Sequence, residues 1–181
     1  MSSEPMSSFF PTIYLTILLL LLGLAAWVVF QQILRTRKVE SALSRLQSKL
    51  SKEKGTTQEY FELGSIFLSK NLFDQAIDQF QRALKAAEAE SEENIAPIYS
   101  AMGYAYFAQE QYDIAIRNYK EALKISPRYV TALNNLGHAY ERKNLTAQAL
   151  EAYEQALAQE PKNAVSRRRA ESLRKRLVPS T

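Results

Sequence analysis

The sequence predicts an all-α protein in which an N-terminal apolar helix precedes a stack of helical hairpins. Two observations support this prediction: a pattern of large, small and aromatic residues recurs after 34 positions, and no charged residue occurs from Pro5 through Leu34. The chain has no cysteine, one histidine and five scattered glycines, which excludes disulfides, thiolate metal sites, clusters of histidine ligands and a glycine-rich phosphate loop.

The apolar stretch Ile13 to Phe30 reads IYLTILLLLLGLAAWVVF. About 20 apolar residues cross the hydrocarbon core of a bilayer as a helix, and Tyr14 and Trp27 lie near the ends of the stretch, where amphipathic rings favour the interface. The alternative is a cleaved secretory signal, but no Lys or Arg precedes the stretch and it exceeds a normal signal core. We expect a short N-terminal segment, 1–8, and an uncleaved transmembrane helix, 9–34.

The segment that follows, 35–54, is basic and predicts the orientation of the chain. It carries seven Lys or Arg and two Glu, and no Lys or Arg precedes the apolar stretch. The positive-inside rule therefore places the C-terminal side in the cytoplasm or, in a plastid, in the stroma. We expect a basic juxtamembrane helical linker here, with one apolar stripe formed by Val39, Leu43, Leu46 and Leu50.

Two interpretations of this linker remain open. One is a short coiled coil, or a membrane-surface helix whose basic face meets anionic headgroups. The other, which we favour because fewer than three heptads are present, is a stalk that packs on the domain that follows.

The recurring pattern is clearest in two adjacent copies. Its members are Tyr99, Met102, Gly103, Tyr106, Ala115, Tyr119, Ala122 and Pro127, then Leu133, Leu136, Gly137, Tyr140, Ala149, Tyr153, Ala156 and Pro161. This spacing is the signature of the tetratricopeptide repeat, a pair of antiparallel helices. A weaker copy upstream has Tyr60, Leu63, Gly64, Phe67, Ala76, Phe80 and Ala83, with Glu88 in place of the closing proline.

We therefore expect three repeats, over 57–90, 96–129 and 130–163. Small residues at Gly103, Ala115 and Ala122 let the two helices of a repeat approach, and Tyr106 and Tyr119 fill the remaining volume. Gly64 and Gly103 are 39 residues apart, against 34 for Gly103 and Gly137, so about five extra residues separate the first two repeats.

Local signals predict where the helices begin and end. Thr56 with Glu59 resembles a capping box that opens the first repeat. Asp74, Asp113 and Thr146 are expected N-caps of the second helices, and Pro97 suits the first turn of its helix. The acidic segment 86–94 either extends the second helix of the first repeat or forms a solvated loop, and a role as an acidic contact site is a further possibility.

The segment 164–178 is expected to form a basic capping helix. Val165, Ala170, Leu173 and Leu177 can face the last repeat, and the outer face carries Arg167, Arg168, Arg169, Arg174, Lys175 and Arg176. This face either solvates the end of the stack or binds anionic lipid or an acidic partner. The region 55–161 has a net charge of −6 between basic flanks, which argues against a nucleic-acid binder with one broad basic face.

The stacked first helices should line a groove, the best candidate for a functional site. The expected lining is Phe61, Ser65, Leu68, Ser100, Tyr104, Phe107, Asn134, His138 and Glu141. Such a groove suits an apolar or amphipathic helix, or an extended segment, of a protein partner. Some tetratricopeptide co-chaperones hold a terminal carboxylate with Lys and Asn at these positions, but the Lys are missing here. Tyr104 and Phe107 alternatively pack on a neighbouring helix, and His138 alternatively forms a polar wall.

The layout resembles a known family, most clearly over Tyr119 to Leu177, in ALKISPRYVTALNNLGHAYERKNL and in EPKN followed by RRRAESLRKRL. This is similar to the small thylakoid tetratricopeptide proteins of cyanobacteria and algal plastids that assist photosystem I assembly. The resemblance implies a single-pass thylakoid membrane protein with its repeats on the cytoplasmic or stromal side. It also implies photosystem I subunits or intermediates as clients, and neither catalysis nor a cofactor.

The leading hypothesis is thus a non-catalytic, membrane-anchored scaffold that assists assembly or stability of photosystem I. The alternative is a general membrane-docked adaptor for a translocon, a chaperone or another membrane complex. An enzyme is not expected, because no motif pairs carboxylates or places a nucleophile beside a base.

Overall fold

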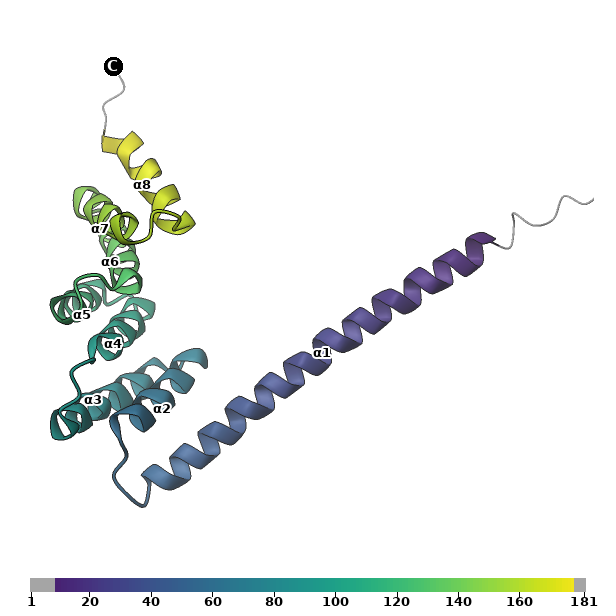
Figure 1. Cartoon of the computed structure of the whole chain (residues 1–181), viewed down its shortest axis with the longest axis horizontal. Helices are drawn as coiled ribbons and strands as arrows, with labels where there is room; N and C mark the ends of the chain where they lie inside the picture. The colour runs from purple at the N-terminus through teal and green to yellow at the C-terminus, as the bar shows by residue number, and fades with distance from the viewer. Residues whose placement is uncertain (1–8, 178–181) are drawn as a thin grey trace, which may run out of the picture. The chain divides into compact units, whose positions relative to one another are not determined.

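The computed structural model describes residues 9–177, which are all-helical apart from short connections (Figure 1). The expected N-terminal segment, 1–8, and residues 178–181 lie outside the described part. The chain divides into two compact units, one ending at Arg45 and one beginning at Leu46. The predicted all-α class, with one apolar helix followed by a tetratricopeptide-type stack of helices, is confirmed.

The first unit consists of most of helix α1, which spans Phe9–Leu50. It is long and apolar enough to cross a membrane, by length and composition. From Ile13 to Leu34 its large apolar side chains are all exposed within the protein. The helix continues without a break through the expected boundary at residue 34, because no Gly or Pro interrupts the sequence between the apolar stretch and the basic linker.

The last turn of α1 belongs to the second unit. Leu46 is 2% exposed, whereas Val39, in the first unit, is 37% exposed. Lys49 Nζ lies 2.5 Å from a carboxylate oxygen of Glu59, which is in the first turn of α2. The end of α1 is therefore packed and paired with the first repeat, as the stalk interpretation requires.

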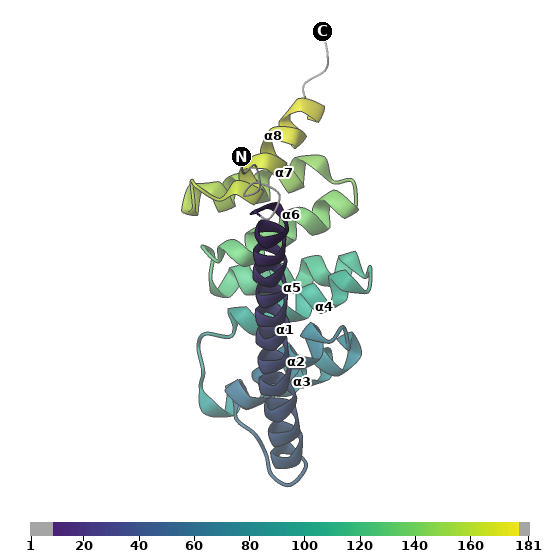
Figure 2. The same ribbon diagram turned by 90° about the vertical axis from the view of Figure 1, so that its right-hand side faces the viewer.

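The second unit contains three helix pairs and a final helix, stacked in chain order (Figure 2). The helices are α2 (Thr57–Ser69), α3 (Phe73–Glu90), α4 (Ala96–Ala108), α5 (Tyr112–Ile125), α6 (Val130–Arg142), α7 (Thr146–Gln159) and α8 (Ala164–Leu177). Figure 1 shows α2, α4, α6 and α8 along one side of the stack and α3, α5 and α7 along the other. The acidic segment extends α3 to 18 residues, against 14 for α5 and α7.

Each helix pair is closed by a glycine that faces an aromatic ring. A Cβ placed on Gly103 would lie 2.7 Å from the Tyr119 ring, and one on Gly137 would lie 2.8 Å from the Tyr153 ring. Both tyrosine side chains are almost fully buried, as are the alanines beside them. The expected close approach of the two helices is confirmed, and it leaves no room for a side chain at the repeat glycine.

The extended α3 supplies a cap for a helix 33 residues earlier in the chain. The backbone N–H of Thr57 donates to both carboxylate oxygens of Glu90, at 3.2 and 3.3 Å. The predicted capping box at the same end of α2 is also present, with Thr56 and Glu59 exchanging hydrogen bonds. The positive N-terminal end of α2 is thus held by two carboxylates.

The expected N-caps Asp74, Asp113 and Thr146 are wrong. The second helices begin one residue before each Asp and at Thr146 itself, and their N-cap residues make no side-chain hydrogen bond. The physical reason is the tight turn between paired helices: a left-handed residue such as Asn71 (φ 59°) ends the first helix and leaves no room for an extended capping residue.

Both aspartates instead connect adjacent repeats. Asp74 accepts a hydrogen bond of 2.6 Å from the side-chain amide of Gln109, and Asp113 forms an ion pair with Lys143. Gln109 and Lys143 are the C-cap residues that directly follow α4 and α6. The carboxylates also lie in the first turn of their helices, where negative charge is favourable.

The expected apolar face of α8 is partly wrong. Ala170 and Leu173 are buried as expected, but Val165 and Leu177 are 53% and 45% exposed. Ser166 is buried in place of Val165, because the Asn163 side chain accepts a hydrogen bond of 3.0 Å from the Ser166 N–H and so fixes where the helix begins. One residue of helix corresponds to about 100°, which turns Val165 away from the stack.

Candidate functional site

The side of the stack formed by α2, α4 and α6 presents three side chains at one repeat position, each directly after the repeat glycine. They are Ser65, Tyr104 and His138, and we call this surface the A-helix face. Tyr104 is 47% exposed, whereas Ser65 and His138 are half-buried. The Ser65 hydroxyl donates to the Phe61 carbonyl at 2.8 Å, so Tyr104 is the large side chain most available to a partner.

Other residues expected to line the groove are engaged within the protein. Ser100 is buried at 4% exposure, and Leu68 is half-buried. The Phe61 ring packs on Phe80 of α3, with ring centroids 5.7 Å apart. Asn134 accepts a hydrogen bond from the hydroxyl of Ser166 in α8. Phe61 and Asn134 thus face a paired or a following helix, and Ser100 is buried, so only part of the expected lining is available on the A-helix face.

Phe107 joins two repeats rather than standing free. Its ring centroid lies 4.7 Å from that of His138 in α6 and 5.4 Å from that of Tyr112 in α5. The guanidinium of Arg142 in turn lies over the Tyr112 ring, 5.0 Å from its centroid. The two residues thus behave differently. Phe107 packs on a neighbouring helix, whereas Tyr104 is exposed and remains available to line a groove.

The junction of α6, α7 and α8 holds a polar cluster centred on Glu141. The phenol of the buried Tyr153 donates to Glu141 at 2.7 Å, and Arg169 lies 3.4 Å from its other carboxylate oxygen. Burial, and then the bond to Glu141, raise the pKa of Tyr153 far above its ordinary value. Tyr153 therefore stays protonated as a donor, and Glu141 is occupied by protein groups.

His138 is a neutral ring on the A-helix face at physiological pH. Burial lowers its pKa below the ordinary value, and the nearby Arg169 adds to the shift, while Glu141 opposes it. Within the part of the chain that the structure describes, no group donates to or accepts from its ring nitrogens. The imidazole is thus held by Phe107 and has one donor and one acceptor to offer a partner.

The basic side chains of α8 divide into two groups. Arg169 pairs with Glu141, Arg174 pairs with Glu154 at 2.7 Å, and Arg167 donates to the Pro161 carbonyl. The remaining cations have no ion pair among residues 9–177, and they are Arg168, Lys175 and Arg176.

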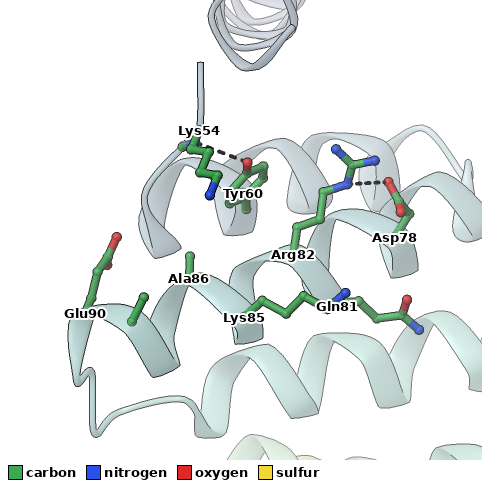
Figure 3. A pocket seen from close by; sticks show the side chains of 10 residues that line it. Lys54, Tyr60, Asp78, Gln81, Arg82, Lys85, Ala86 and Glu90 are labelled. Atoms are coloured by element: carbon green, nitrogen blue, oxygen red, sulfur yellow. Dashed lines mark hydrogen bonds and ion pairs between the residues drawn. The ribbon is translucent and has the colours of Figure 1, made fainter. Parts of the chain in front are cut away.

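A cavity of about 540 Å³ lies where the linker after α1 meets α3 (Figure 3). Its polar groups are mostly satisfied internally: Arg82 pairs with Asp78 at 3.0 Å, and the Tyr60 hydroxyl accepts from the Gly55 N–H at 3.1 Å. Lys54 and Lys85 on its rim make no ion pair within the described residues. No sequence signal pointed to this cavity, because it forms where Lys54 and Gly55, in the connection between α1 and α2, lie close to α3.

Among the described residues, no three His, Cys, Asp or Glu side chains come together in a way that holds a metal ion. The buried titratable groups that the structure does contain, Tyr119 and Tyr153, lie between helices. The A-helix face itself presents an aromatic ring, a neutral imidazole and hydroxyl groups.

Models of the tetratricopeptide repeat match residues 60–90, 103–144 and 130–163. A chloroplastic tetratricopeptide repeat domain-containing protein of Arabidopsis thaliana, PYG7, is 34% identical over 91% of this chain and 54% of its own length. The protein ycf37 of Cyanophora paradoxa is 35% identical over 83% of this chain and 87% of its own. The ycf37 of Guillardia theta is 34% identical over 96% and 97%.

The chain thus spans about half of the Arabidopsis relative and nearly all of the Guillardia one. Among solved structures, MamA matches with a TM-score of 0.69 at 20% identity, over 78% of this chain and 80% of its own. The first repeat domain of Spaghetti (RPAP3), bound to the HSP90 peptide SRMEEVD, matches with a TM-score of 0.62 at 19% identity, over 69% and 95%. These solved structures share the fold, and the chain belongs to the family of plastid tetratricopeptide repeat proteins that includes ycf37 and PYG7.

Proposed function

We propose that this protein is a membrane-anchored scaffold that binds protein clients on its A-helix face and assists the assembly or stability of photosystem I. The observation that carries the proposal is the match to ycf37 of Guillardia theta, which extends over 96% of the chain and so includes the apolar helix as well as the repeats. The sequence resemblance to thylakoid assembly proteins supplies the client class, photosystem I subunits or intermediates.

The A-helix face has the chemistry of a protein-binding surface. Exposed aromatic side chains in a mostly polar surrounding are common centres of binding energy. Tyr104 is such a side chain, with Phe107 and His138 fixed in contact beside it. A client segment that covers the Tyr104 ring would bury its apolar edge and leave the hydroxyl free to hydrogen-bond.

The exposed apolar side chains of α1 support a place in the thylakoid membrane. Water is a poor solvent for this surface, whereas the bilayer core accepts it. The seven basic residues after the apolar stretch support a cytoplasmic or stromal side for the repeats. Anchoring raises the concentration of the A-helix face near membrane clients without requiring further contacts.

We infer a role without catalysis or a cofactor, because the A-helix face presents no nucleophile beside a base. Cysteine, the strongest nucleophile among side chains, is missing from the whole sequence. Reproducible turnover by the purified full chain would contradict this inference.

The proposal is tested by crosslinking in thylakoid membranes that contain the full chain, followed by gentle solubilisation and identification of the proteins recovered with it. Photosystem I subunits should be recovered with the wild-type chain and reduced with Tyr104→Ala. Ala108→Ser, an exposed change at the end of the same helix, serves as the control. Recovery of translocon or chaperone components in place of photosystem I subunits would overturn the photosystem I role in favour of a general adaptor.

A further inference from the structure

Helix α8 occupies the place of a first helix in a fourth repeat. Helices α4, α6 and α8 begin at Ala96, Val130 and Ala164, a constant interval of 34 residues. The buried stripe of α8 repeats at the same interval, as the buried positions show: Ile98, Met102 and Ala105 in α4, Ala132, Leu136 and Ala139 in α6, and Ser166, Ala170 and Leu173 in α8. The last helix is thus more than a polar cover, because it continues the geometry of the stack.

The side of α8 that would receive a second helix is charged. In α6, Leu133 and Gly137 are buried at the positions that pack within the pair. The corresponding residues of α8, 34 positions on, are Arg167 and Glu171, and both are exposed. These side chains give no apolar surface for a paired helix. The buried side of α8 therefore follows the repeat pattern, whereas the side that would face a second helix does not.

The A-helix face continues onto α8 with a different chemistry. Ser172 takes the repeat position of Tyr104 and His138, and Arg168 and Lys175 lie one turn before and after it. In α6, the positions that match Arg168 and Lys175 are Asn134 and Glu141. Both are covered by α8 itself, through the hydrogen bond of Asn134 with Ser166 and the ion pair of Glu141 with Arg169. Within residues 9–177 no helix covers α8 in this way.

We propose that α8 forms a cationic subsite at the end of the A-helix face, which binds acidic residues of the same client segment that covers Tyr104. This inference rests on the proposed function and adds the chemistry of the partner. Arg168, Lys175 and Arg176 are exposed and form no ion pair in the described part of the chain. Glu171 is their only acidic neighbour on α8 and pairs with none of them, so the subsite keeps a net positive charge.

A protein segment fits this subsite better than a lipid surface. A helix that lies on a membrane inserts a continuous apolar face, but the inner apolar side chains of α8, Ala170 and Leu173, are buried against the stack. The exposed apolar residues, Val165 and Leu177, lie at opposite ends of the helix. The cations instead continue a surface that already offers Tyr104 and His138. A client segment would match this surface if its apolar part covered the two rings and its acidic residues met the cations of α8.

The test places the photocrosslinking residue p-benzoylphenylalanine at Ser172 or, separately, at Tyr104 of the full chain in thylakoid membranes. Adducts are identified by mass spectrometry. We expect both positions to capture the same protein, and the peptide captured at position 172 to be rich in Asp and Glu. The double reversal Arg168→Glu with Lys175→Glu should lower the yield at both positions about fivefold or more, and about 0.5 M salt should do the same.

The matched control is the double reversal Arg117→Glu with Arg128→Glu, which changes the net charge equally on exposed residues of α5 and the turn after it. It should leave the yields unchanged. Capture at position 104 that is insensitive to the α8 reversal would overturn the subsite and leave the proposed function standing. Lipid adducts at position 172, or equal losses in the control, would also overturn the subsite. Capture of no protein at either position would overturn the proposed function itself.

Discussion

Gly103 and Tyr104 are neighbours in α4 and belong to two different parts of the molecule. Gly103 lies against the buried Tyr119 ring and has no space for a side chain, whereas the Tyr104 side chain is 47% exposed. The glycine is the same in all three repeats, but the next residue is Ser65, Tyr104 or His138 in turn. Positions that pack a helix pair keep a small, an apolar or an aromatic residue through the stack, and positions on the A-helix face vary in character.

Two consecutive residues can therefore have different roles, one in the stability of the fold and the other in binding a partner. Side chains in the helix pairs are confined by close packing, so a change there alters the free energy of unfolding. Side chains on the A-helix face have few neighbours, so a change there should alter binding and leave folding nearly unchanged.

Gly103→Leu should destabilise the full chain most. A Cβ at this position already lies 2.7 Å from the Tyr119 ring, and the rest of the leucine side chain would separate α4 from α5. We expect a loss on the order of 1–3 kcal/mol or more, measured as the free energy of unfolding in detergent by circular dichroism. Tyr104→Leu, one residue away, is the control and should unfold like the wild type. Equal stability of the two variants would refute the assigned helix pairing.

Tyr153→Phe and Tyr119→Phe should differ although both rings are buried at equivalent positions. The Tyr153 hydroxyl donates to Glu141 at 2.7 Å, whereas the Tyr119 hydroxyl has no hydrogen bond within the described residues. A hydrogen bond to a charged group contributes about 1.5–3 kcal/mol, so Tyr153→Phe should cost about 1.5 kcal/mol and Tyr119→Phe little. Denaturant titrations of the two variants measure this difference, and equal losses would show that the cluster around Glu141 does not stabilise α6 against α7.

Glu110→Asn should stabilise the second repeat. Glu110 has φ 61° in the turn between α4 and α5, and the matching turn residues in the other repeats are Asn71 and Asn144, with φ 59° and 58°. Asparagine tolerates this left-handed conformation better than glutamate does, while the exposed ion pair of Glu110 with Arg142 contributes little. We expect a gain of about 0.5 kcal/mol in chemical unfolding, with client recovery unchanged. A loss of stability would mean that the ion pair outweighs the backbone strain.

His138 should make stability fall slightly as the pH falls. Burial lowers its pKa in the folded protein, so the unfolded chain binds more protons around and below the ordinary histidine pKa of about 6.5. The free energy of unfolding should therefore decrease between about pH 7.5 and pH 5.5, and it should decrease less in His138→Gln. The comparison uses thermal unfolding of both chains at each pH. Identical slopes would indicate that protonated His138 is tolerated in the folded state.

Local and periodic signals in the sequence were sufficient to predict much of the fold. The capping box of Thr56 and Glu59 depends on residues three apart, and the contact of Gly103 with Tyr119 follows from the repeat. The expected caps at Asp74 and Asp113 failed because, after the left-handed turn, each helix begins two residues earlier than an Asp cap would place it. Sequence patterns resolve helix ends poorly, since a shift of one residue changes few apolar positions.

The candidate site was harder to predict because contacts between segments distant in the sequence decide which of its residues are covered and which are exposed. Asn134 is covered by Ser166 and Glu141 is occupied by Arg169, and both partners lie on a helix expected only as a cap. The cap of α2 by Glu90 likewise joins residues 33 positions apart. A repeat pattern shows which side of a helix a residue occupies, but it does not show which neighbour covers it.

The division between packed and exposed positions is tested most sharply by measuring stability and client recovery in the same variant, Tyr104→Ala of the full chain. We expect a free energy of unfolding within about 0.5 kcal/mol of the wild type and a recovery of crosslinked client that is lower by about tenfold. A stability loss as large as that of Gly103→Leu would instead place Tyr104 in the packed core. Unchanged recovery in a fully stable variant would remove the A-helix face from the binding site.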